Sequence, residues 1–142
     1  MNITAFIISL CDCTTRICLP LKKEIIRDLA TNALRTYAYL NRPTARELKE
    51  RIKRKGLEEA SFRPLIADIK AVNKTLKYLK ANEENKIILE AVEAVYFTRP
   101  KEKLNRTEII NRCGIFAVKK EISERKVYNY LKTARRIYAK YN

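Results

Sequence analysis

Four polar side chains near the C-terminus have the types and spacing that suit contact with a nucleic acid. Arg125, Asn129, Lys132 and Arg136 are spaced i, i+4, i+7 and i+11, so a helix would place them on one face. A guanidinium can donate two hydrogen bonds to guanine, and an amide can pair with adenine. We therefore expect Arg125 to contact guanine and Asn129 to contact adenine or phosphate. Lys132 and Arg136 suit phosphate, a contact that positions the protein without reading sequence.

The helix that carries these side chains is expected over about 124–140. Ser123 precedes it as a typical N-cap residue. The opposite face repeats apolar side chains at helical spacing: Val127, Leu131, Ala134, Tyr138 and Tyr141. One face would pack while the other meets a polyanion. The alternative is a solvated basic helix that only closes a bundle.

A second helix pattern precedes this one, which makes the pair a candidate helix-turn-helix. Asn105 and Glu108 match an N-terminal cap, and Gly114 is the expected turn. The side chains expected to point inward from this first helix are Ile109, Ile110 and Cys113.

Residues 116–122 interrupt the standard motif, since Ser123 would ordinarily follow Ile115 directly. The segment either extends the first helix or forms a wing-like loop that touches DNA. The full set of expected DNA contacts is Arg106, Lys119, Lys120, Arg125, Lys126, Asn129, Lys132, Arg135 and Arg136.

The overall charge agrees with a polyanionic partner. The chain has 142 residues and a net charge of +15, from 31 Lys and Arg against 16 Asp and Glu. The excess lies in residues 21–56 and 99–142, with a near-neutral block between them. Such an excess favours nucleic acid, an acidic membrane surface or an acidic protein.

The remaining periodicity predicts an all-α fold, an array of five to seven helices. Helices are expected over 21–40, from Thr44 to Gly56, over 61–81 and over 83–97. Thr44 and Glu47 form a capping box, and Gly56 suits a helix C-terminus. The two near-neutral helices, 61–81 and 83–97, are the expected packing centre. The basic residues 53–55 suit either the negative end of their own helix or a phosphate.

We divide the chain into an apolar arm of unclear role (1–20), a helical core region (21–104) and a helix-turn-helix region (105–142) that forms one compact unit with the core. The arm does not match an export signal, and its apolar run is too short to span a bilayer.

Composition argues against an enzyme and against a metal or cofactor. The chain has no His and only 2 Gly, which excludes imidazole chemistry and glycine-rich phosphate loops. A zinc site would need all four thiolates, Cys11, Cys13, Cys18 and Cys113, at a spacing unlike paired zinc knuckles. Free thiols in a reducing cytoplasm are the expected state.

Three segments resemble the C-terminal half of ArpU-type phage transcriptional regulators, and more loosely sigma factor region 4. They are IILEAVEAVY (87–96), TEIINRCGI (107–115) and SERKVYNYLKTARRIYA (123–139). Residues 65–79 also resemble the central part of that family, and residues 1–20 do not. The resemblance implies a DNA-binding activator of phage late or prophage genes, with Arg125, Lys126 and Asn129 facing the DNA.

The sequence thus predicts a sequence-specific, double-stranded DNA-binding transcriptional regulator in the cytoplasm of a bacterial host. Contact with RNA polymerase and a homodimer are the expected protein interactions, and no membrane is expected. Two alternatives stay open. One is a small terminase-like DNA-packaging protein, which would form rings, and the other is an RNA-binding antiterminator.

Overall fold

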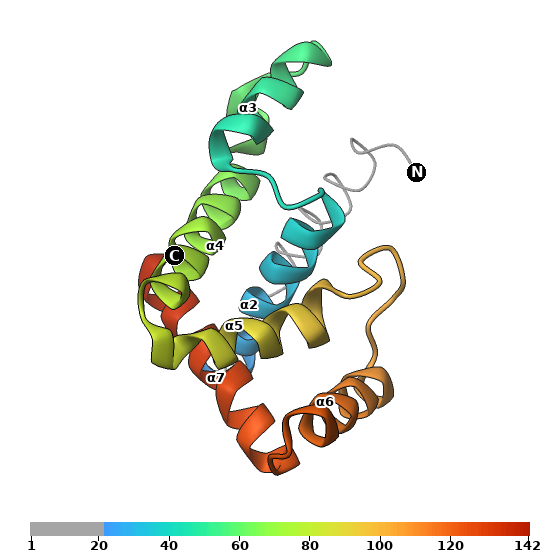
Figure 1. The fold of residues 1–142 in the computed structure, drawn as a ribbon. Helices are drawn as coiled ribbons and strands as arrows, with labels where there is room; N and C mark the ends of the chain where they lie inside the picture. Colours follow the sequence, from blue (N-terminus) through green and yellow to red (C-terminus); the bar gives the residue numbers. More distant parts are fainter. Residues whose placement is uncertain (1–21) are drawn as a thin grey trace.

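The computed structural model describes residues 22–142, with side chains from Leu29 onward. Within this range there are six α-helices and no strand (Figure 1). The predicted all-α array of five to seven helices is confirmed. The apolar arm (1–20), with Cys11, Cys13 and Cys18, lies outside the described residues.

The first two helices match the sequence signals that predict them. Helix α2 spans Lys22–Tyr39 and α3 spans Ala45–Arg54. The hydroxyl of Thr44 accepts a hydrogen bond from the backbone N–H of Glu47 at 3.1 Å, which satisfies one free donor at the start of α3. Gly56 follows α3 with φ of 69°, a conformation that costs glycine little.

Helix α4 spans Arg63–Ala81 and follows the 3₁₀ turn η1, Glu59–Phe62. It begins two residues after Ser61, because Pro64 sits in its first turn, where its missing N–H costs nothing. Asn73 fixes α4 against the start of α3: its side-chain oxygen accepts from the N–H of Ala45 at 2.9 Å, and its amide donates to the carbonyl of Pro43 at 3.1 Å.

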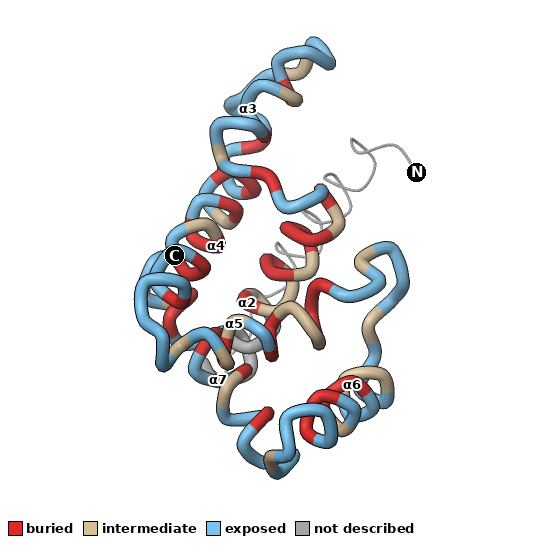
Figure 2. The backbone as a smooth tube through the Cα atoms, in the orientation of Figure 1, coloured by how far each residue is buried: buried red, intermediate tan, exposed pale blue. Residues whose placement is uncertain are grey.

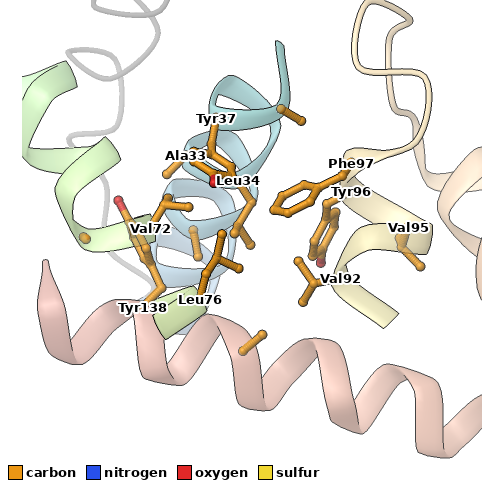
Figure 3. Close-up of a cluster of buried hydrophobic side chains, with 14 of the residues drawn as sticks. Ala33, Leu34, Tyr37, Val72, Leu76, Val92, Val95, Tyr96, Phe97 and Tyr138 are labelled. Carbon is orange, nitrogen blue, oxygen red and sulfur yellow. The ribbon is translucent and has the colours of Figure 1, made fainter. Parts of the chain in front are cut away.

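The next helical segment is in turn a 3₁₀-helix, an α-helix and a π-helix. A 3₁₀ turn η2 at Glu83–Asn85 leads into α5, Lys86–Val92, which continues as the π-helix η3, Glu93–Phe97. The π winding buries three consecutive side chains, Val95, Tyr96 and Phe97. Tyr96 and Phe97 point towards α2 and Val95 points away from it (Figure 3).

The last two helices are α6, Arg106–Lys120, and α7, Glu124–Tyr141. Helix α7 contacts α2, α4, α5 and α6, so the C-terminal helix is the element around which the others pack. The two helices expected as the packing centre, 61–81 and 83–97, are part of this core. Those helices supply much of the buried aliphatic surface, but α7 joins them to α2 (Figure 3).

The described chain is elongated. Helix α3 lies at one end and the α6–α7 turn at the other, with α4 running from the α3 end towards the middle (Figure 1). Because α7 packs on α2, α4 and α5, residues 106–141 share one core with the helices that precede them.

Candidate nucleic-acid interface

Helices α6 and α7 are joined by a tight turn of three residues, Glu121, Ile122 and Ser123. Glu121 is left-handed, with φ of 56° and ψ of 44°. Its N–H bonds the carbonyl of Val118 at 3.2 Å, and the N–H of Ile122 bonds that of Ala117 at 3.0 Å. This pair of bonds is the Schellman pattern, which satisfies the last carbonyls of a helix. Ser123 then caps α7, with its hydroxyl accepting from the N–H of Lys126 at 3.2 Å.

This geometry corrects the predicted position of the turn. Gly114 lies inside α6, and residues 116–120 extend that helix instead of forming a wing-like loop. The physical reason is burial, because Phe116 and Ala117 continue the packed face begun by Cys113. Glycine fits at 114 because a Cβ there would lie 3.2 Å from the Glu124 carboxylate of α7.

The exposed face of α7 carries the four polar side chains whose spacing predicts a contact with nucleic acid. Arg125, Asn129, Lys132 and Arg136 are all exposed, and within the described chain none of their side chains has an ion-pair or hydrogen-bond partner. Lys126 is also exposed and has no acidic partner there. The helix therefore presents a continuous set of available donors and positive charges.

The buried face of α7 follows the prediction except at its end. Val127, Leu131, Ala134 and Tyr138 are buried, as expected, and Ile137 joins them. Tyr141 is 40% exposed, because it lies in the last turn of the helix, beyond the packed core.

Arg135, a predicted phosphate contact, is partly engaged within the fold. Its side chain is half-buried, and Nη1 donates to the hydroxyl of Tyr96 at 2.8 Å. Tyr96 is itself buried against the core. Arg135 therefore links α7 to η3, and we set it apart from the exposed cations.

The three predicted contacts on α6 occupy its two ends. Arg106 lies in the first turn and is exposed, and Lys119 lies in the last turn and is exposed. Lys120 forms an ion pair with Glu90 of α5, and its Nζ lies 6.0 Å from the centre of the Phe116 ring. Lys120 thus ties α6 to α5, whereas Arg106 and Lys119 have no ion-pair partner in the described part of the chain.

The inward face of α6 is narrower than predicted. Cys113 is fully buried and Ile109 half-buried, but Ile110 is exposed, against expectation. Ile115 and Val118 are more exposed still, at 63% and 80%. Burial raises the pKa of the Cys113 thiol to about 11, which keeps it protonated and unreactive.

Two arginines that the sequence patterns did not single out bind the backbone at the end of η3 and in the loop that follows it. Arg112 is buried. Its Nη1 donates to the carbonyls of Val95 at 2.8 Å and Thr98 at 2.7 Å, and its Nε pairs with Glu108 at 3.1 Å. Arg35 of α2 binds five carbonyls of the adjoining segment, those of Tyr96, Thr98, Arg99, Pro100 and Glu102.

These contacts satisfy the carbonyls of Val95 and Tyr96 at the end of η3 and four carbonyls of the loop that follows it. Burial, and next the positive charge of Arg112, lower the pKa of Arg35. No local pattern separates such arginines from surface ones, because their partners are backbone atoms 61 or more residues away for Arg35 and 14 or more for Arg112.

A groove of about 480 Å³ lies between η3 and α6. It is lined by charges of both signs, and two opposite pairs, Glu90 with Lys120 and Glu108 with Arg112, are already matched within it. Its lining residues carry four positive and three negative charges, so the excess is a single positive charge.

No family model, curated protein or solved structure matches the chain. In residues 22–142, no group of three His, Cys, Asp or Glu side chains could hold a metal ion. The described helices include none that is long and apolar enough to cross a membrane.

Proposed function

We propose that the protein is a sequence-specific, double-stranded DNA-binding transcriptional regulator, without enzymatic activity, that acts in the cytoplasm of a bacterial host. The exposed face of α7 would enter the major groove. The assignment to phage or prophage late genes, and regulation through RNA polymerase or as a homodimer, rest on the resemblance to ArpU-type regulators alone.

One observation carries the DNA-binding proposal. Arg125, Asn129, Lys132 and Arg136 form an exposed, unpaired face on the helix that follows a three-residue turn. A helix-turn-helix protein presents the second helix of this motif to the major groove, with its N-terminal residues nearest the bases. Arg125 is in the first turn and Asn129 in the second, so these two have the position for base contact.

The phosphate contacts would flank the base contacts. Lys132 and Arg136 continue the same face toward the C-terminus of α7. Lys119 and Lys126 lie on either side of the turn, and Arg106 starts α6. Lysine and arginine both contact phosphate through their charge, and arginine and asparagine can also make bidentate contacts to bases.

The test begins by selecting a preferred duplex from a random pool and then measures affinities by fluorescence anisotropy. Arg125→Ala should weaken binding to that duplex by about 1–3 kcal/mol and relax the base preference at one position. Lys132→Gln should weaken all duplexes alike and lower the slope of log K against log salt by about 0.9. Arg46→Ala is the matched control, since Arg46 is exposed on α3 at the far end of the molecule.

Three results would contradict the proposal. The first is a pool from which no preferred duplex emerges. The second is unchanged duplex affinity in both α7 variants, which would remove α7 as the reading helix. The third is preferential binding of structured RNA over duplex of equal length, which would favour the antiterminator alternative. Light scattering that shows a large ring would favour the terminase-like alternative.

A further inference from the structure

Helix α4 carries a row of positive side chains. The near-zero net charge of this part of the chain does not reveal it. Arg63, Lys70, Lys74 and Lys77 are all exposed and are spaced i, i+7, i+11 and i+14. At 3.6 residues per turn they fall within about 60° of one another, over a length of about 21 Å. We call these four residues the α4 basic stripe. This part of the chain is near neutral because acidic side chains, most of them outside α4, offset the positive charges of the stripe.

Nothing within the described chain neutralises the stripe. None of the seven ion pairs there includes any of its four residues. Asp68, the one acidic residue of α4, is directed at α7, where it accepts a hydrogen bond from the Tyr138 hydroxyl at 3.2 Å. The stripe therefore has a local excess positive charge along its whole length.

The stripe lacks the features of a base-reading surface or a protein interface. Asn73, the one amide of α4, is engaged by the start of α3. Protein interfaces have apolar or aromatic anchors at their centre, and on this face only Tyr78 is a large exposed hydrophobic residue. Lysines without such neighbours suit the phosphate backbone, which is contacted through charge.

A groove extends the stripe at its N-terminal end. It has a volume of about 420 Å³ and lies between η1 and α4, with Arg63 and Lys70 on one side and Lys49 of α3 nearby. Glu59 is the one acidic residue that lines it, and it is paired with Lys49 at 3.7 Å. This end of α4 lies beside α3, away from the α6–α7 turn (Figure 1), and α4 is exposed along its outer side (Figure 2).

We propose that the α4 basic stripe is a second DNA-binding surface, which holds the sugar–phosphate backbone of duplex DNA outside the site read by α7. The proposal rests on the DNA-binding function proposed above. The bound backbone belongs either to DNA that flanks the site or to a second duplex. In both cases the contact is independent of base sequence.

The test compares a short duplex of roughly 15 bp, which covers one site, with a duplex of roughly 45 bp that contains the same site. The variant Lys70→Gln, Lys74→Gln, Lys77→Gln should lower the salt slope on the long duplex by about 2.7, or 0.9 for each lost phosphate contact. Its slope on the short duplex should stay that of the unaltered protein. An effect that appears only when a second free duplex is added would identify the second-duplex arrangement.

Two control proteins separate charge from structure. The triple substitution to arginine keeps the charge and should keep the slope on the long duplex. Lys80→Gln removes one charge from the same helix at a position about a quarter turn away from the stripe, and should change the slope little.

An unchanged slope on the long duplex, with no effect when a second free duplex is added, would overturn the proposal and leave the α7 interface intact, provided that Arg125→Ala still weakens binding. An equal loss on both duplexes would also overturn it, because the stripe would then be part of the α7 site. If the unaltered protein binds neither duplex, the proposed function fails and this inference fails with it.

Discussion

Asp68 joins α4 to α7 through a single side-chain contact. Its carboxylate accepts from the Tyr138 hydroxyl at 3.2 Å in a partly buried position. Burial raises its pKa from 3.8 to about 6, and the Tyr138 hydrogen bond opposes this shift only in part. The folded state therefore holds the Asp68 proton more tightly than the unfolded state does.

The sign of this shift sets a pH dependence. Between about pH 4 and pH 6 the folded chain binds more protons at Asp68, so this group's contribution to stability falls as pH rises through that window. Asp68→Asn should remove the contribution while keeping an acceptor for Tyr138. The stability of the variant relative to the unaltered protein should thus be higher at pH 7 than at pH 4, by less than about 3 kcal/mol because solvent screens a partly exposed group.

Urea unfolding of both proteins at several pH values measures this difference in stability. The contributions of the other carboxylates are the same in both proteins and therefore cancel. Tyr138→Phe is the matched control, because it removes the hydroxyl and retains the carboxylate. A relative stability that is flat from pH 4 to pH 7 would show that Asp68 titrates normally.

At the scale of the element, α6 is the helix whose course the sequence misplaces. Its continuity through Gly114 can be tested with the two glycines of the chain. Gly114→Ala should stabilise the protein by up to about 1 kcal/mol, since alanine favours a helix interior. The Glu124 carboxylate, 3.2 Å from the new Cβ, must shift slightly to allow this gain.

Gly56→Ala should have the opposite effect on stability from Gly114→Ala. Gly56 has φ of 69° and open space around the position of a Cβ, so alanine there is strained by its backbone alone. We expect a loss of about 1 kcal/mol. Thermal unfolding of the two variants compares them directly. A destabilisation by Gly114→Ala that persists when Glu124 is also replaced by alanine would place the turn at Gly114.

Local signals account for most of what the sequence predicted correctly. Thr44, Asn105 and Ser123 each cap the helix that they precede, because a cap depends on residues three positions apart. The left-handed position fell on Glu121 and not on Gly114, since the burial of Phe116 outweighs glycine's preference for turns. Arg35 and Arg112 were missed because their carbonyl partners are set by the tertiary fold.

The α4 basic stripe shows that a sum of charges over a segment does not predict where those charges lie on the surface. Summed over residues 57–98, the charges nearly cancel, so the total conceals the row of positive side chains on one face of α4. On α4, as on α7, one helix carries both the apolar and the polar repeat, so the spacing of the residues indicates the two faces. Nothing in the sequence indicated that Arg135 would turn to Tyr96.

At the scale of the whole molecule, α7 is shared between the exposed face and the core. Leu131 is almost fully buried where α7 packs. Leu131→Ala should cost about 2–5 kcal/mol and should lower the stability of every helix in one transition. Lys132→Ala, next in sequence but exposed, should change stability by less than about 0.5 kcal/mol.

Circular dichroism and tyrosine fluorescence, followed together during denaturation, check this prediction. Coincident curves would show a single cooperative unit. Separate transitions, with α6 and α7 melting apart from α2–α5, would contradict the shared core.

Because α7 supplies both the exposed face and part of the core, a ligand that binds it can be detected through a change in protein stability. Because α7 belongs to the only core in the described residues, a molecule that binds its exposed face stabilises the whole unit and not a detachable module. A ligand at about 100 times its Kd would add about 2.7 kcal/mol to the free energy of unfolding. A melting-temperature screen of nucleic acids against the unaltered protein, repeated with Arg125→Ala, would therefore find a target whose base sequence has not been determined.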